Sequence, residues 1–206
     1  DTNRDDVTER TVDSVGNAVF IVEASSGRMI AEISNNSNAT HVISDMKYSV
    51  PARVAVIDRD FDGLVDHLYV PDMGGNLFRI DIYNGQSLPN LFFGKKIYTT
   101  SIDNSAEKNR RFYNAPDVAE IVHDNEHYYA VSIGSGYRAH PLNETIQDSV
   151  IMLKDKGIFA QSDGLYTFPA ISNIAQITPE TPTIEDISTF DGYEFNLDTG
   201  EKVITG

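Results

Sequence analysis

The chain has 206 residues, of which 40% are hydrophobic and 10% aromatic, and this composition is typical of a folded globular domain rather than a disordered segment. Its 31 acidic residues outnumber its 16 Lys and Arg residues, which gives a formal net charge of −15 and argues against binding to nucleic acid or anionic lipid. The chain has no cysteine, so disulfides, thiol catalysis and cysteine-based zinc sites are excluded. It also has no apolar run of about 18 residues, so we expect no membrane insertion.

Strand-like segments follow one another along most of the chain. Their residues alternate or are rich in β-branched and aromatic types, and predict strands at residues 18–22, 53–57, 67–70, 76–82, 128–133 and 149–153. Gly, Asn, Asp and Ser bound most of these segments and favour turns there. No amphipathic helix of three turns competes with them, so the predicted fold class is all-β.

Three segments outside these strands receive different predictions. Residues 34–38 and 102–111 are polar and are expected to form surface loops. Residues 169–182 carry isoleucines between polar residues, a pattern that fits either a crossing between two sheets or an edge strand.

A weak internal repeat runs through the predicted strands. Each copy begins with a glycine, at Gly16, Gly75 and Gly192, and continues as a short strand toward a second glycine. The interval between the second and third copies is close to twice the interval between the first and second. Such spacing is typical of β-propeller blades of roughly 40–50 residues that carry insertions.

The repeat predicts a partial or modified β-propeller of three or four blades. A closed propeller buries each blade against its neighbours, and three or four blades would leave two uncovered ends. We therefore expect residues 1–206 to form a single propeller domain that is an incomplete fragment of a larger protein.

The segment between the predicted strands 53–57 and 67–70 is acidic and reads DRDFDGLVD. An EF-hand loop supplies oxygen ligands to calcium from positions 1, 3, 5, 7 and 9 and has glycine at position 6. The corresponding ligands are Asp58, Asp60, Asp62, the main-chain carbonyl of Leu64, and Asp66. Four carboxylates so close together repel one another unless a cation lies between them. The spacing therefore predicts a Ca²⁺ site.

This loop differs from a helical EF-hand in two ways. Position 12, which normally holds a bidentate Glu, is Tyr69, so Asp66 is expected to take over that role. The flanking segments have strand patterns, so the metal is predicted to hold a strand-to-strand turn. The pattern leaves open whether calcium only rigidifies the turn or also regulates partner binding. Loops of this kind with modest affinity suit calcium-rich fluid outside the cell, which favours an exported protein.

The acidic loop and its surroundings resemble a known family. The resemblance rests on four blocks that are spread over nearly the whole chain, residues 16–27, 48–79, 134–142 and 200–203. Together they are similar to the C-terminal propeller of the PilY/PilC family of type IV pilus biogenesis factors and tip adhesins.

The resemblance implies a modified β-propeller whose acidic loop binds calcium through Asp58, Asp60, Asp62, Leu64 and Asp66. It implies a role in pilus extension versus retraction, twitching motility and surface attachment. The partners it implies are minor pilins in a pilus tip complex and a host or abiotic surface, and the location it implies is the cell surface or the pilus tip.

No catalytic or organic cofactor-binding residue is predicted. Residues 123–127 fit the His-x-x-Glu-His pattern of inverted zincins, but that pattern needs a helix, and Asp124-Asn125 favours a hairpin tip. The Gly134-Ser135-Gly136 segment lacks the spacing of a nucleophile elbow. We therefore expect that the protein is not an enzyme.

Two alternative functions remain open. A generic calcium-stabilised extracellular interaction propeller, such as an integrin-like repeat, would use the same acidic loop. A fragment of a quinone-dependent dehydrogenase fits less well, because its blades rely on tryptophan docking residues and this chain has no Trp.

Overall fold

The computed structural model describes residues 11–100, 107–123, 125–159, 161–162, 164–169, 171–178 and 189–204. Over these ranges the chain is all-β and contains no α-helix, as the sequence predicts. The same ranges consequently hold no helix of the length and apolarity that a membrane crossing requires.

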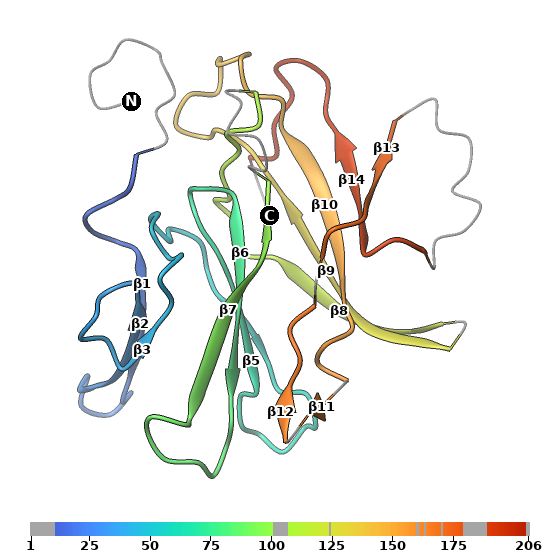
Figure 1. Ribbon diagram of the computed structural model, residues 1–206. Coiled ribbons are helices and arrows are strands. Elements are labelled where there is room, and N and C mark those ends of the chain that lie inside the picture. Colours follow the sequence, from blue (N-terminus) through green and yellow to red (C-terminus); the bar gives the residue numbers. More distant parts are fainter. Residues whose placement is uncertain are drawn as a thin grey trace.

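Three sheets contain the longer strands (Figure 1). The first sheet has the order β1-β2-β3, with β1 (Ala18–Val22), β2 (Met29–Ser34) and β3 (His41–Val42). The second has the order β4-β5-β6-β7, with β4 (Ala55–Ile57), β5 (His67–Pro71), β6 (Asn76–Ile82) and β7 (Phe92–Thr99).

The third sheet has the order β13-β14-β10-β9-β8. Its strands are β8 (Asp117–His123), β9 (Glu126–Gly134), β10 (Ser149–Asp155), β13 (Ile174–Ile177) and β14 (Gly192–Asn196). The last strand in the chain, β14, thus lies between β10 and β13, antiparallel to the first and parallel to the second. A short ribbon of β11 (Gln161–Ser162) and β12 (Leu165–Tyr166) forms a fourth, two-stranded sheet.

The second sheet lies between the other two and is covered on both faces (Figure 1). Successive side chains of a strand point to opposite faces of its sheet. On β6, Phe78 and Ile80 accordingly belong to the cluster shared with the first sheet, whereas Leu77 belongs to the cluster shared with the third. This double coverage explains why β5 and nearly all of β6 are buried.

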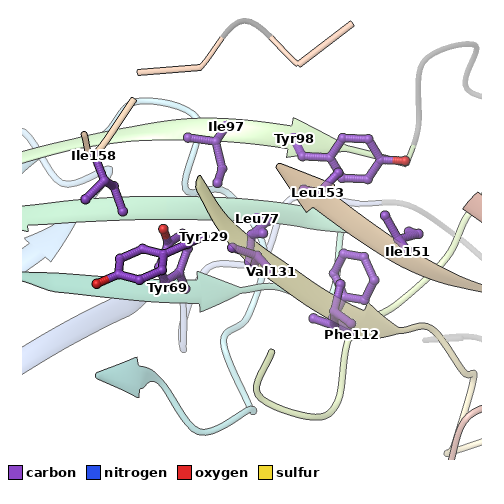
Figure 2. Packing of buried hydrophobic residues seen from close by; sticks show 11 residues of the cluster. Tyr69, Leu77, Ile97, Tyr98, Phe112, Tyr129, Val131, Ile151, Leu153 and Ile158 are labelled. Carbon is purple, nitrogen blue, oxygen red and sulfur yellow. The ribbon is translucent and has the colours of Figure 1, made fainter. Parts of the chain in front are cut away.

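The cluster between the second and third sheets is the larger core (Figure 2). Its buried members are Tyr69, Leu77, Ile97, Tyr98, Phe112, Tyr129, Val131, Ile133, Ile151, Leu153 and Ile158. Phe112 comes from the segment before β8 and Ile158 from the segment after β10, so these connecting segments also contribute to the core.

All six predicted strands exist, although their ends differ by up to two residues. The three copies of the glycine repeat form β1, β6 and β14, one strand in each of the three larger sheets. None of the sheets closes on itself within the described ranges, so the propeller arrangement and the single incomplete domain stay predictions.

The prediction of a surface loop at residues 102–111 is wrong for its last part. Residues 102–106 lie outside the described ranges, but Asn109, Arg110 and Arg111 are buried. Arg110 forms an ion pair with Glu194 and donates hydrogen bonds to the Asn196 Oδ1 atom (2.7 Å) and the Gln147 carbonyl (2.6 Å). Its charge is therefore satisfied inside the protein by partners far away in the sequence.

The segment from residue 169 to residue 182 contains β13, which pairs with β14 and, among the described strands, forms an edge of the third sheet. Of the two alternatives left open for this segment, the edge strand is the one observed. Residues 170 and 179–182 lie outside the described ranges.

Candidate metal site

The acidic loop connects the antiparallel strands β4 and β5. The Asp66 N–H donates to the Ile57 carbonyl at 2.9 Å and closes the loop at its base. Gly63 has a φ of +90°, a conformation that glycine adopts without steric cost. The strand-to-strand turn expected from the flanking sequence is thus present.

Three carboxylates of this loop gather at one place. One oxygen atom each from Asp58, Asp60 and Asp66 lies within 4.8 Å of the others. Asp58 directly follows β4 and Asp66 directly precedes β5, so the group joins the two ends of the loop. In the part of the chain that the structure describes, no other group of three His, Asp or Glu side chains converges in this way.

Main-chain N–H groups of the loop hold these carboxylates in place. The Gly63 N–H donates to Asp58 Oδ2 at 2.9 Å, and the Arg59 N–H donates to Asp66 Oδ2 at 2.8 Å. The Asp62 N–H donates to Asp60 Oδ1 at 3.3 Å. The loop backbone therefore orients all three side chains.

The second carboxylate oxygen of Asp58, Oδ1, indicates that the acidic group lacks a partner. Asp58 Oδ1 is buried and has no hydrogen-bond partner among the described residues. A buried carboxylate oxygen without a partner is costly, and a bound cation would remove that cost. Asp58, Asp60 and Asp66 therefore fit a metal ion, since hard cations prefer oxygen ligands.

The structure does not bring Asp62 into this group. Asp62 is exposed, and its Oδ1 atom accepts a hydrogen bond from the Leu64 N–H at 2.7 Å. Three of the four predicted carboxylates are thus together, while the roles of Asp62 and of the Leu64 carbonyl as ligands stay predictions.

One residue that supports the acidic group was missed by the sequence analysis. Asn84 lies just after β6, and its Nδ2 atom donates to Asp66 Oδ1 (3.2 Å) and to the Val65 carbonyl (3.1 Å). The pairing of His67 with Asp81 places the end of β6 beside the start of β5. Only knowledge of this register would have indicated Asn84.

A buried polar network lies next to the loop and was also missed. His67 Nδ1 is 2.7 Å from Asp81 Oδ1, and Arg79 Nε is 2.9 Å from the same oxygen. Arg79 Nη1 also donates to Asp155 Oδ1 at 2.8 Å, and the Tyr69 hydroxyl donates to Asp155 Oδ2 at 2.9 Å. This network connects β5 and β6 of the second sheet with β10 of the third.

The His-x-x-Glu-His segment forms the tip of the β8–β9 hairpin, as predicted. His123 is the last residue of β8 and pairs with Glu126, the first residue of β9, while Asp124 lies outside the described ranges. His127 Nε2 is 2.7 Å from Glu120 Oε1, and its ring stacks on Phe159 with centroids 3.4 Å apart. His127 thus has structural partners at the tip.

Neither a family model nor a curated protein matches the chain in sequence. Among solved structures, the C-terminal domain of PilY1 from Pseudomonas aeruginosa matches 93% of this chain with a TM-score of 0.59 and 15% sequence identity. The chain therefore has a PilY1-like fold. The match covers 47% of the PilY1 chain, so the present chain spans about half the length of that structure.

Proposed function

We propose that the chain is a calcium-binding region of a type IV pilus biogenesis factor or tip adhesin and acts at the cell surface or pilus tip. The observation that carries the proposal is the convergence of Asp58, Asp60 and Asp66, with one buried oxygen left unpaired, in a fold similar to that of PilY1. The resemblance of the acidic loop and its flanks to the PilY/PilC family supports the same conclusion.

The ligand set favours calcium over magnesium. Calcium accepts six to eight oxygen ligands in flexible geometry, whereas magnesium demands a near-ideal octahedron. Asp60 and Asp62 are exposed, so water molecules can complete the coordination from the solvent side. The EF-hand spacing adds the Leu64 carbonyl and Asp62 as further ligands in this proposal.

The metal would act on the ends of two strands. Without a cation the carboxylates repel one another and loosen the loop. With calcium bound, Asp58 at the end of β4 and Asp66 at the start of β5 are held together, and the Asn84 amide extends this connection to the turn after β6. Calcium therefore stabilises the loop and the surface next to it.

The tip of the loop carries the surface that calcium would hold in shape. Phe61 has a φ of +60° and is 85% exposed, and Leu64 is 51% exposed. A positive φ is uncommon for a residue other than glycine, and such strain gathers at functional sites. We assign Phe61 and Leu64 to partner contact in this proposal.

The proposed partners are minor pilins of the tip complex together with a host or abiotic surface. Calcium occupancy would thereby influence whether the pilus extends or retracts, and with it twitching motility and attachment. The proposed role is not enzymatic.

Calorimetric titration of calcium into the chelator-stripped chain tests the metal site. We expect saturable binding at one site, and loss of that binding in Asp60→Asn, which removes one charge but keeps the oxygen that accepts the Asp62 N–H. Asp117→Asn is the matched control, because Asp117 is also exposed and lies on β8, in another sheet. Equal binding by both variants, or no binding by the unmodified chain, would contradict the assignment.

Motility assays separate the pilus role from simple metal binding. Cells that produce the Asp60→Asn protein should show altered pilus extension, retraction or attachment, whereas Asp117→Asn cells should not. Normal pilus extension, retraction and attachment in cells whose protein has lost calcium binding would contradict the regulatory part of the proposal.

A further inference from the structure

A cavity of about 620 Å³ lies beside the second sheet, and its lining does not include Asp58, Asp60 or Asp66. It is formed by the turn between β6 and β7, by the start of β7, by β3 and by Gly164 and Leu165, and its lining includes His41, Tyr83, Gln86, Asn90, Phe92 and Phe93. Its volume is within the range of about 300–1,000 Å³ that is typical of small-molecule sites.

Aromatic rings form part of its walls, and contacts with other rings hold them in place. Phe93 is 46% exposed, and its ring centroid lies 6.2 Å from that of His41 and 5.7 Å from that of Phe168. The Tyr83 ring stacks on Tyr166 with centroids 5.5 Å apart, and the Tyr83 hydroxyl accepts the Tyr166 N–H at 2.9 Å. These contacts fix the rings, so the surfaces that they present to the cavity need no rearrangement to receive a ligand.

Polar groups on the same lining are available to a ligand. Gln86 and Asn90 are exposed, and their side-chain amides have no hydrogen-bond partner among the described residues. Each amide offers two N–H donors and one carbonyl acceptor. They come from the same turn, so both can reach one bound molecule.

The imidazole of His41 is neutral in this position. Its Nε2 atom accepts the Gly94 N–H at 3.0 Å, and burial lowers the pKa of the side chain. The proton of the neutral ring must then be on Nδ1, which is a donor. His41 thus adds a hydrogen-bond donor and no charge.

The described part of the lining lacks charged side chains. Among the described residues that line the cavity, none is Asp, Glu, Lys or Arg, although 23% of the chain is charged. A charged ligand would lose hydration there without gaining a partner of opposite charge. The cavity consequently suits a neutral molecule that has both apolar faces and hydrogen-bonding groups.

We propose that this cavity binds a neutral saccharide. One face of a pyranose ring is a surface of C–H groups that packs on aromatic rings such as Phe93 and Tyr83, while hydroxyls at its rim match the donors and acceptors of Gln86 and Asn90. An extended peptide is disfavoured, because it would pair with the edge of β7, where the Gly94 N–H is already bonded to His41. The inference does not depend on metal binding by the acidic loop.

Saturation-transfer NMR on the 206-residue chain tests the proposal. The neutral probes are lactose, maltose and N,N′-diacetylchitobiose, and the charged probes are sialyllactose and a galacturonic acid disaccharide. We expect transfer to at least one neutral probe and an affinity about tenfold lower in Phe93→Ala, since loss of one aromatic face removes a contact of that order. The double variant Gln86→Ala/Asn90→Ala should weaken binding in the same way without touching the protein core.

Phe20→Ala is the matched control, because Phe20 is a 57% exposed phenylalanine on β1, in the first sheet. It should bind the probe as the unmodified chain does, and near-UV circular dichroism should show that all variants are folded. Three results would overturn the proposal: no transfer to any neutral probe, unchanged affinity in both cavity variants, or equal binding of the charged probes.

Discussion

Asp60 is the exposed member of the acidic group, and its charge has opposite effects with and without a cation. Without metal it adds repulsion to Asp58 and Asp66. With calcium it is a ligand. The sign of its contribution to stability should therefore change with calcium.

We predict that the Asp60→Asn variant is at least as stable to heat as the unmodified chain without calcium and less stable with calcium. In EGTA the variant should melt at the same temperature or up to about 2 °C higher, because a like-charge contact at the surface is worth under about 1 kcal/mol. In calcium at 100 times its Kd the unmodified chain should gain about 2.7 kcal/mol, or about 5–10 °C, and the variant should gain little. Scanning calorimetry under both conditions checks this, and a variant that gains as much as the unmodified chain would contradict it.

The spacing of acidic residues predicted that Asp58, Asp60, Asp62 and Asp66 come together in one short loop, and the structure gathers three of them, Asp58, Asp60 and Asp66. The spacing could not predict Asn84, which reaches Asp66 only through the pairing of β5 with β6. Local spacing thus identified the part of the candidate site within one loop, and the part contributed by another strand required the fold.

At the scale of elements, the contact between β6 and β10 depends on charges as well as on apolar packing. Arg79 and Asp155 are both fully buried, and Arg79 Nη1 lies 2.9 Å from Asp155 Oδ2 as well as 2.8 Å from Oδ1. Arg79 also donates to the Thr167 carbonyl at 2.7 Å and lies over the Phe168 ring at 4.3 Å. One guanidinium therefore connects the second sheet, the third sheet and the segment after β12.

We expect Asp155→Ala to destabilise the protein by about 3–5 kcal/mol, because it leaves the Arg79 charge buried without one of its partners. Urea unfolding monitored by circular dichroism measures this. The matched control is Asp45→Ala, which removes an exposed ion pair to Lys96 at 3.2 Å and should cost under about 1 kcal/mol. If the two variants lost similar amounts of unfolding free energy, the buried pair would not stabilise the contact between the sheets as proposed.

Strands with a clear alternation of residue types were predictable, whereas short ones were not. The two-residue strands β3, β11 and β12 are too short to show a period. The buried position of Arg110 was also hidden, because its polar neighbours in the sequence predict a loop and its partner Glu194 lies in another strand. Local composition does not report partners that only the tertiary fold supplies.

At the scale of the whole molecule, the pKa values of the core tyrosines reflect their burial between the sheets. Burial raises the pKa of Tyr69 and Tyr98 above the ordinary value and raises that of Tyr129 to about 12. All three belong to the core between the second and third sheets. Their unfolded pKa is about 10, so the folded state holds their protons more strongly than the unfolded state does.

Ionisation of these tyrosines should therefore leave the stability of the protein unchanged below about pH 10 and lower it as the pH rises from 10 toward 12. Absorbance at 295 nm should show early ionisation of the accessible tyrosines and a later step that coincides with loss of the circular dichroism signal. The urea-unfolded chain is the control and should ionise all its tyrosines near pH 10. A single step near pH 10 in the folded protein, with its circular dichroism unchanged, would contradict this.

The fold class was predictable from composition and alternation, but the arrangement of the sheets was not. The glycine repeat correctly marked a strand in each of the three larger sheets, yet these strands hold different positions: β1 is at an edge, whereas β6 and β14 are internal. The repeated sequence therefore indicated a comparable strand in each of these sheets, but it did not show how many strands each sheet contains.

The position of β14 also has a consequence for how the chain is made. Synthesis proceeds from the N-terminus, so β10 leaves the ribosome well before β14, the strand that covers its free side. In that interval β10 pairs with β9 but its other side is an unpaired edge, β13 has no neighbour to join, and Arg110 is without Glu194. The third sheet is therefore completed only after residue 196 has emerged, and a ribosome that stalls earlier leaves a nascent chain with an exposed strand edge that is open to pairing with another chain.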